Sequence, residues 1–427
     1  MTSTSIAFDA SAATADHAAV LDRSDPLSHF RDRFHVPKLD SGGEVIYFTG
    51  NSLGLMPRTA RDYVDQELDD WARLAVEGHM KAKHPWLPYH EFLTSQMATI
   101  IGAKPIETVV MNSLTVNLHL LLVSFYRPTA TRYKIFIEKG AFPSDQYAVR
   151  SQIGFHAVAQ NDALIELEPR PGESTLRTED IVDAIERDRD SIALVLLGGV
   201  NYYSGQAFDM REITAAGHRA GAVVGFDLAH AVGNLELKMH DWGVDFACWC
   251  SYKYLNGGPG AVGGAYIHER HADRGEIPRF AGWWGHDKET RFLMGPEFKA
   301  IRGAEGWQIS NPPILQMAAL RASLEIFDEA GMPALRQKSE KLTGYLEFLV
   351  DQIGDQRVSI VTPRDPAERG CQISIRVSDR GLFTALTSRG VEADWREPDV
   401  IRVAPVPLYN SFTDVHNFAQ ILSECLN

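Results

Sequence analysis

Two charged residues stand at the ends of apolar segments that read as buried strands. Asp227 closes AVVGFD, and Lys253 follows FACWC within CWCSYKYLNGG, residues 248–258. A lysine is rarely found beside a buried strand unless its amine has a partner or a reaction there. In an open parallel sheet, ligands bind at the carboxyl ends of the strands, and the 26-residue spacing fits one strand–connection–strand unit. The pair is therefore either a structural ion pair or the centre of a binding site.

Pyridoxal phosphate chemistry requires both of these residue types. A lysine binds the cofactor as a Schiff base, and a partly buried position favours the neutral amine that this needs. A carboxylate at the pyridine nitrogen keeps that nitrogen protonated, so the ring can accept electrons. Tyr252 can donate a hydrogen bond to a phosphate, and Gly257 lets the backbone approach the cofactor closely. We therefore expect pyridoxal 5'-phosphate, bound to Lys253 and paired with Asp227.

Two nearby patterns suggest other chemistry. GPGAVG, residues 258–263, matches G-x-G-x-x-G, but a dinucleotide site needs a helix after the glycines, and GAYIHE reads as a strand. A zinc site is disfavoured because no second CxxC motif and no HExxH motif completes one. We expect core cysteines, surface histidines and no metal. The side chains concerned are His230, Cys248, Cys250, His268 and His271.

The elements around this pair indicate an α/β fold. The segments SIALVLLGG, AVVGFD and VDFACWC read as buried strands, and DMREITAAGHRAG reads as a helix with an Asp cap and a terminal glycine. Strands that alternate with helices predict a mostly parallel sheet flanked by helices. Upstream, Val64, Leu68 and Trp71 recur at helical spacing and predict an amphipathic helix from Ala60 to Val76.

The chain divides into three predicted parts. Residues 1–25 are rich in Ala, Ser, Thr and Asp and predict a flexible leader. Residues 26–330 contain the N-terminal segment and the large α/β domain. Residues 331–427 predict a smaller α+β domain, with a helix around Leu335–Val350, strands at CQISIRV and VIRVAPV, and a last helix.

Composition narrows the partners and the compartment. Lys plus Arg is 42 and Asp plus Glu is 56, so the formal net charge of the 427 residues is −14. This balance argues against nucleic acid or an anionic membrane as a partner. Four cysteines do not make a disulfide framework, and the longest apolar run, IALVLLGGV, is too short to span a bilayer. No secretory signal is visible, and we expect a cytoplasmic protein.

From about residue 40 to the end, the chain resembles the kynureninase family. The main resemblance lies in GFDLAHAVGNLELKMHDWGVDFACWCSYKYLNGGPG. Further segments follow in the family's order: YFTGNSLGL, NSLTVNLHLLLVSFY, FPSDQYA, GWWGHD, ISNPPI and IRVAPVPLYNSF. The resemblance implies a fold-type-I pyridoxal phosphate enzyme of the aspartate aminotransferase superfamily.

The resemblance also implies roles for individual residues. Lys253 would form the Schiff base, Asp227 would pair with the pyridinium nitrogen and His230 would lie near the phenolic oxygen. The other implied cofactor contacts are Phe142 stacked on the ring, Asp145 beside it, and Leu114, Thr115 and Tyr252 at the phosphate. Alone, Phe142 would read as core and Thr115 as a helix cap, so these roles depend on the resemblance.

Substrate contacts and a partner subunit are implied in the same way. Arg402 would bind the substrate's α-carboxylate bidentately, although its spacing alone suggests a surface arginine. Trp283 and Asn311 would reach the cofactor from a second subunit, which implies a homodimer with shared sites. His79, Ser52 and the Ser310–Asn311 pair are the remaining substrate-binding candidates. Polar groups beside the aryl ring favour the 3-hydroxy substrate, although His79 is equally consistent with a helix C-terminal histidine.

The implied reaction is hydrolysis of the Cβ–Cγ bond of kynurenine or 3-hydroxykynurenine, which yields an anthranilate and alanine in tryptophan breakdown or NAD biosynthesis. Lys253 would remove the Cα proton, and Tyr252 would relay a proton to Cβ. The alternative is a cysteine desulfurase or selenocysteine lyase, which shares the Asp…Lys arrangement. Those enzymes usually place His before the lysine, where this chain has Tyr252, and the EADWREPDVIRVAP segment has no cysteine.

Overall fold

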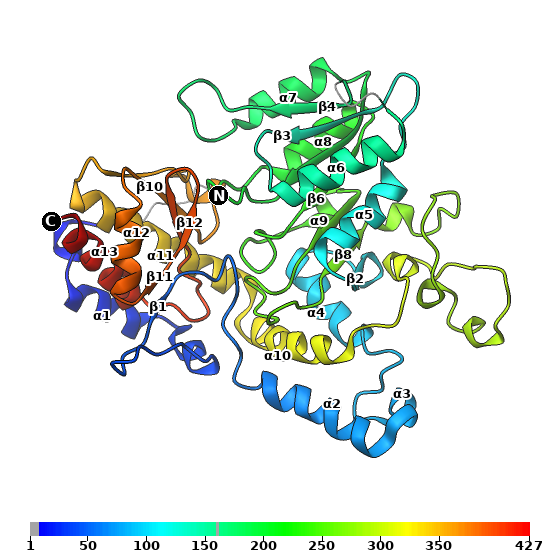
Figure 1. Cartoon of the computed structure of the whole chain (residues 1–427), viewed down its shortest axis with the longest axis horizontal. Helices are drawn as coiled ribbons and strands as arrows, with labels where there is room; N and C mark the ends of the chain where they lie inside the picture. Colours follow the sequence, from blue (N-terminus) through cyan, green and yellow to red (C-terminus); the bar gives the residue numbers. More distant parts are fainter. Residues whose placement is uncertain (1–7, 159–161) are drawn as a thin grey trace.

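A computed structural model describes residues 8–158 and 162–427. Its main element is a seven-stranded sheet with the strand order β2-β8-β7-β6-β5-β3-β4 (Figure 1). Only β8 runs antiparallel to its neighbours, so the predicted mostly parallel sheet is confirmed. The strands are β2 Thr108–Val110, β3 Lys134–Glu138, β4 Leu164–Leu167, β5 Ile192–Gly198, β6 Val223–Asp227, β7 Phe246–Trp249 and β8 Gly264–Ile267.

Helices cover both faces of this sheet because alternate strand residues enter two different hydrophobic cores. In β5, Leu194 and Leu196 pack with the core under α5 and α6, whereas Val195 and Leu197 pack with the core under α4, α7, α8 and α10. These helices are α4 Glu91–Ile101, α5 Leu114–Phe125, α6 Pro143–Phe155, α7 Thr178–Arg187, α8 Met210–Arg219 and α10 Ile314–Ala330, with the short α9 Met239–Trp242 before β7.

The C-terminal domain is built on a four-stranded antiparallel sheet with the order β12-β13-β10-β9, beside the large domain in Figure 1. This sheet and the α11, α12 and α13 helices share a separate hydrophobic core. The elements are α11 Met332–Ile353, β9 Val358–Ile360, β10 Ile373–Val377, α12 Gly381–Ser388, β11 Val391–Glu392, β12 Asp394–Arg396, β13 Val400–Val403 and α13 Phe412–Leu426.

The amino-terminal part of the chain also packs on this domain. The short strand β1, Ile46–Tyr47, pairs with β11, and Ala18 of α1, Ala15–Ser24, is buried in the same core. In Figure 1, α1 lies beside α13 of the C-terminal domain. The predicted flexible leader is therefore corrected for residues 8–25, whereas residues 1–7 lie outside the described residues.

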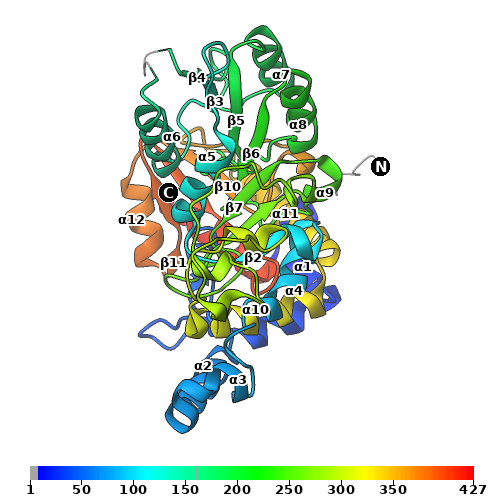
Figure 2. The same ribbon diagram turned by 90° about the vertical axis from the view of Figure 1, so that its right-hand side faces the viewer.

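The predicted helix at 60–76 is confirmed as α2, Ala60–Leu74, followed by the single turn α3, Gly78–Lys81. Figure 1 and Figure 2 both show α2 and α3 extending from the bottom of the molecule. The carboxyl-terminal part of the apolar stripe of α2 points outward: Trp71 is 61% exposed and Val76, just beyond the helix, is 77% exposed. The inner side is mixed, because Val64 packs partly buried against the core, and Glu67 and Asp70 are buried together with Ala60.

In the described ranges, 8–158 and 162–427, no helix combines the length and apolarity needed to cross a membrane.

Candidate active site

A cavity opens at the carboxyl ends of β3, β5 and β6. Glu138, Gly198 and Asp227 are the last residues of these strands, and Lys253 follows the end of β7 by four residues. The sheet thus brings together the two residues, Asp227 and Lys253, that the sequence singled out. The cavity is lined by Leu114, Thr115, Glu138, Phe142, Ser144, Asp145, Gly198, Val200, Tyr202, Asp227, Ala229, His230, Tyr252 and Lys253.

The amine of Lys253 lies 3.0 Å from Nε2 of His230. Burial, and then the positive charge of Lys253, hold the pKa of His230 well below its usual range, so the imidazole is neutral and accepts this hydrogen bond. The same amine lies 5.8 Å from the centre of the Phe142 ring. Lys253 is therefore held between a neutral histidine and an aromatic face.

Two carboxyl groups share the inner end of the cavity. Burial, and then the negative charge of Asp227, raise the pKa of Asp145 well above its usual range. Burial also raises the pKa of Asp227, against a 2.7 Å hydrogen bond from the Ala229 N–H group and the charge of Lys253. A cationic group placed between the two carboxyl groups would lower both pKa values, because it offsets the charge that burial disfavours.

At the other end of the cavity, the amino terminus of α5 supplies Leu114 and Thr115. The first N–H groups of a helix have no intrahelical partner and carry partial positive charge, which suits a phosphate. Thr115 Oγ1 lies 2.9 Å from the hydroxyl of Ser144. Tyr252 also lines the cavity, and burial raises the pKa of its hydroxyl, which stays protonated as a hydrogen-bond donor.

Arg402 on β13 approaches the cavity from the C-terminal domain. Its side chain is only 1% exposed, donates to the Tyr202 carbonyl at 2.7 Å and pairs with Asp394. The alternative of a surface arginine is therefore wrong. Its Nε atom is buried without a hydrogen-bond partner among the described residues, so the guanidinium retains one donor for a ligand.

The remaining predicted site residues do not line this cavity in a single chain. His79 Nδ1 lies 2.9 Å from the Val76 carbonyl, and the ring packs edge-on against Trp86. Trp283 donates to Asn311 at 3.1 Å, and both side chains are exposed. Ser310 lines a separate hollow with Asn311 and residues 111–113.

Ser52 is exposed in a turn that touches the Lys253 loop from outside the cavity. The N–H group of Gly54, two residues on, donates to the Tyr252 carbonyl at 2.8 Å. A Cβ atom at Gly54 would lie 2.4 Å from the Lys253 carbonyl oxygen, so only glycine allows this approach.

The chain matches a family model and several curated relatives. A model of the kynureninase C-terminal domain matches residues 335–422. The kynureninase of Koribacter versatilis (strain Ellin345) is 61% identical over 423 residues, which cover 99% of each chain. The kynureninase of Myxococcus xanthus (strain DK1622) is 60% identical over 407 residues, which cover 95% of this chain and 96% of the relative.

The chain belongs to the kynureninase family.

Solved structures with low sequence identity confirm the predicted fold-type-I architecture of this kynureninase family member. The apo structure of a cysteine desulfurase from Thermococcus onnurineus NA1 has a TM-score of 0.74 at 19% identity, covering 89% of this chain and 94% of that one. The cysteine desulfurase CsdA from Escherichia coli has a TM-score of 0.74 at 16% identity, covering 94% and 98%.

Six residues that line this kynureninase-family cavity were not among the predicted site residues: Glu138, Ser144, Gly198, Val200, Tyr202 and Ala229. Glu138 ends the apolar strand KIFIE as Asp227 ends AVVGFD, so the pattern that identified Asp227 also marks Glu138. Tyr202 carried no such signal, because it lies in the loop after β5 and its ring reaches the cavity only by packing edge-on against Phe142, 5.3 Å between ring centres.

The residues considered for zinc belong to separate sites. His230 contacts Lys253, and His271 lies 2.9 Å from Asp245. Both histidines are buried, so the expected surface location is wrong for them. Cys248 and Cys250 are buried, as expected of core thiols.

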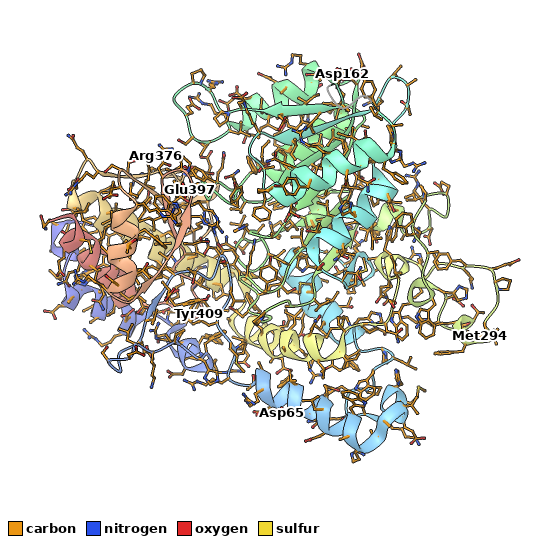
Figure 3. The ribbon with its side chains drawn as sticks, in the orientation of Figure 1. Asp65, Asp162, Met294, Arg376, Glu397 and Tyr409 are labelled. Atoms are coloured by element: carbon orange, nitrogen blue, oxygen red, sulfur yellow. The ribbon has the colours of Figure 1, made fainter. Side chains whose placement is uncertain are left out.

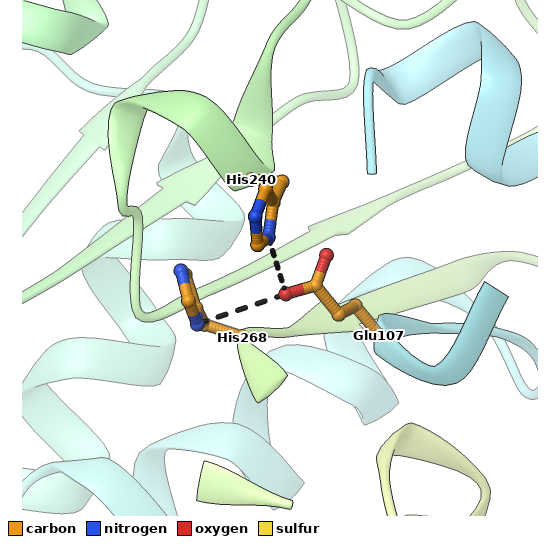
Figure 4. Close-up of side chains that lie close together, drawn as sticks. All are labelled: Glu107, His240 and His268. Carbon is orange, nitrogen blue, oxygen red and sulfur yellow. Dashed lines mark hydrogen bonds and ion pairs between the residues drawn. The ribbon is translucent and has the colours of Figure 1, made fainter. Parts of the chain in front are cut away.

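Of two further clusters of metal-ligating side chains among the described residues, one holds Glu107, His240 and His268 (Figure 4), and the other holds His90, Glu91 and Glu305. A Glu107 oxygen accepts hydrogen bonds from His240 Nδ1 at 2.9 Å and from the Glu269 N–H group at 2.8 Å. Nδ1 of His268 accepts a backbone N–H group at 3.1 Å. These lone pairs are already used, so we interpret the Glu107 cluster as a satisfied hydrogen-bond network and not as a metal site.

Proposed function

We propose that this chain hydrolyses the Cβ–Cγ bond of L-kynurenine and 3-hydroxy-L-kynurenine, giving an anthranilate and L-alanine, with pyridoxal 5'-phosphate as cofactor. The observation that carries the proposal is the convergence of Lys253, His230 and Asp227 in one cavity at the strand ends of a kynureninase family member. As part of the proposal, the enzyme acts in tryptophan catabolism or NAD biosynthesis and is cytoplasmic.

The cavity offers the groups that pyridoxal phosphate needs. Asp145 Oδ1 and His230 Nδ1 are buried there without a hydrogen-bond partner among the described residues, so both are available to a ligand. In the proposal, Lys253 holds the cofactor's aldehyde carbon, Asp227 its pyridine nitrogen and Phe142 its ring face. The remaining groups are Asp145 and His230 at the ring substituents, and Leu114, Thr115 and Tyr252 at the phosphate.

Each of three side chains has a task toward the substrate. Arg402 binds the α-carboxylate through its unpartnered Nε. Lys253 removes the proton from Cα, since its amine faces a neutral His230 that can share the proton. The bound cofactor supplies an electron sink for the charge that develops on the substrate. Water adds to the γ-carbonyl, the Cβ–Cγ bond breaks with its electron pair on Cβ, and the Tyr252 hydroxyl supplies the proton that Cβ takes up.

We further propose a homodimer in which each cavity is completed by the partner. Trp283 and Asn311 lie outside the cavity of their own chain and are exposed. Figure 3 shows Met294 at the outer end of the projecting segment that follows Trp283, and Asp65 on α2, which forms the other projection. Large apolar side chains are exposed on both, among them Trp71, Val76, Leu293 and Met294, which supports their burial against a second copy.

The proposed preference is for the 3-hydroxy substrate. In the proposal, His79 and the Ser310–Asn311 pair supply polar groups for the aryl end, those of the pair from the partner, and Ser52 is a further substrate-binding residue. A site that pairs with a hydroxyl discriminates against a substrate that lacks it, because a buried polar group is then left unpaired.

Product formation from kynurenine and 3-hydroxykynurenine, measured side by side, tests the proposal. We expect alanine and the matching anthranilate from both, faster from the hydroxylated substrate, and a smaller preference in His79→Ala. Faster cleavage of plain kynurenine would refute the preference alone. Bound cofactor without cleavage of either, together with sulfur release from cysteine, would instead support a desulfurase.

A further inference from the structure

A third buried carboxylate, Glu138, lines the cavity beside Asp145 and Asp227, and the proposed chemistry gives it no task. Its side chain is only 3% exposed. One oxygen accepts the Gly198 N–H group at 3.2 Å, and the other accepts the Asn201 amide at 3.3 Å. Glu138, at the end of β3, is therefore hydrogen-bonded both to the last residue of β5, Gly198, and to Asn201 in the loop that follows.

The segment that Glu138 holds is a tight loop, residues 198–204. The Asn201 side-chain oxygen accepts the N–H groups of Tyr203 at 3.0 Å and Ser204 at 2.9 Å, and also the Ser204 hydroxyl at 3.1 Å. This oxygen is fully occupied, so the amide group of Asn201 has one orientation, with its N–H₂ toward Glu138.

The same loop contacts Arg402 through Tyr202. The carbonyl of Tyr202 accepts the Arg402 guanidinium at 2.7 Å, and the Tyr202 ring packs against Phe142. Glu138 and Tyr202 are also the two residues shared by the cavity and the adjoining hollow, which is lined by Asn201, Ser204 and Gln206 among others. They form the wall between the two spaces, and a shift of the loop moves the carbonyl that orients Arg402.

We propose that Glu138 is a positioning residue: by holding the loop at Gly198 and Asn201, its carboxylate sets the orientation of Arg402 toward the substrate's α-carboxylate. The inference rests on the proposed function, in which Arg402 binds that group. It assigns Glu138 to substrate binding and not to the attachment of the cofactor, although Glu138 lies beside Asp227.

Two single substitutions break the contact from opposite sides. Glu138→Gln keeps an oxygen for the Gly198 N–H group but sets an amide N–H₂ against that of Asn201. Asn201→Asp keeps the oxygen that caps the loop but sets a carboxylate against Glu138. Loss of this buried contact at a charged group is expected to raise the KM for kynurenine about tenfold in each variant. We expect kcat to change by less than about threefold, because Arg402 acts in binding.

The double variant carrying both substitutions restores a donor and an acceptor at this contact. The introduced amide donates to the introduced carboxylate, and its oxygen still accepts the Gly198 N–H group. We expect KM to return to within about threefold of the wild-type value, which a merely structural loss would not allow. Glu168→Gln, at an exposed glutamate, is the matched control and should leave KM unchanged.

L-alanine provides a second readout, since it carries the α-carboxylate but no aryl ring. Its inhibition constant should rise in both single variants by the same factor as KM, while the visible absorbance of the bound cofactor stays unchanged. The proposal is overturned if the single variants keep the wild-type KM, if the double variant is no better than either of them, or if Glu138→Gln loses the cofactor absorbance. Failure of the wild-type enzyme to cleave kynurenine would refute the proposed function, whereas the alanine constants would still report on Glu138.

Discussion

Tyr252 and Lys253 are adjacent in the sequence and line the same cavity. Burial raises the pKa of the Tyr252 hydroxyl, so it holds its proton until a strong base forms beside it. We expect Tyr252→Phe to lower kcat about 100-fold, within the range of general acid catalysis, while the cofactor stays bound. Single-turnover rates and the visible absorbance of the cofactor measure the two quantities. Unchanged turnover would remove the proton-donor role.

Glu138 also makes the stability of the protein depend on pH. Burial raises its pKa from 4.5 to about 7, so the folded chain binds more protons than the unfolded chain between these values. Stability therefore falls as pH rises through this window and stays lower above it. Because the amide of Gln does not titrate, we expect the stability of Glu138→Gln relative to the wild type to be about 3 kcal/mol more favourable at pH 8 than near pH 4.5.

Denaturant unfolding at several pH values measures this difference. The exposed control Glu168→Gln should follow the wild-type curve at every pH. If the Glu138→Gln curve runs parallel to that of the wild type, the buried carboxyl does not carry the pH dependence.

At the residue scale, sequence reasoning was most successful where a charged side chain ends an apolar strand, as with Asp227 and Lys253. The same pattern marks Glu138, but its loop partners could not be predicted, because Asn201 and Tyr202 reach the site through an irregular turn. The burial of Arg402 could not be predicted either, because it depends on contacts with Asp394 and with the carbonyl of Tyr202, which lies 200 positions earlier in the chain.

Among the elements, α1 is tied to α13 by one carboxylate. Asp22 accepts the Phe412 N–H group at 2.6 Å and the Thr413 N–H group at 3.1 Å, at the amino terminus of α13. A carboxylate there satisfies free N–H groups and interacts favourably with the helix dipole. We expect Asp22→Ala to lower the free energy of unfolding by about 1–2 kcal/mol, measured by urea titration.

Asp16→Ala, at an exposed residue of the same helix, is the control and should change stability little. Equal stabilities for the two variants would mean that α1 does not support the C-terminal domain. Composition alone predicted a flexible leader here, because the acceptor and its donors are separated by almost the whole chain.

Periodicity predicted the α2 helix but not which side of it faces the protein. The buried side carries Glu67, which accepts hydrogen bonds from Trp86 and Tyr89, both at 2.9 Å. The apolar side, with Trp71, is exposed. Hydrophobic periodicity indicates that the two sides of a helix differ in polarity. It does not indicate which side is buried, because the residues that hydrogen-bond to Glu67 come from another part of the chain.

For the whole molecule, the proposed shared sites predict complementation. Lys253→Ala inactivates a chain's own cavity, and a chain with both Trp283→Ala and Asn311→Ala damages only its partner's. A mixed dimer has one cavity with all residues intact, so an equal mixture after random reassembly should regain about a quarter of the wild-type activity.

Each variant alone should be nearly inactive, and turnover of 3-hydroxykynurenine measures the recovery. As a control, Lys253→Ala mixed with wild type should add nothing to the activity of the wild-type subunits. Mixed dimers that form without recovery would show that Trp283 and Asn311 serve their own chain.

β1 pairs with β11, and α1 packs against α13. Elements from the amino-terminal and carboxyl-terminal parts of the chain therefore lie in one domain. During synthesis, α1 and β1 leave the ribosome long before their partners exist. At about 5–20 residues per second, the roughly 340 residues between β1 and β11 take on the order of 17–70 s to make. The large domain can fold in that interval, before the partners of α1 and β1 have been made. The C-terminal domain therefore completes only after α13 has been made, and until then the apolar residues of α1 and β1 that belong to its core stay uncovered.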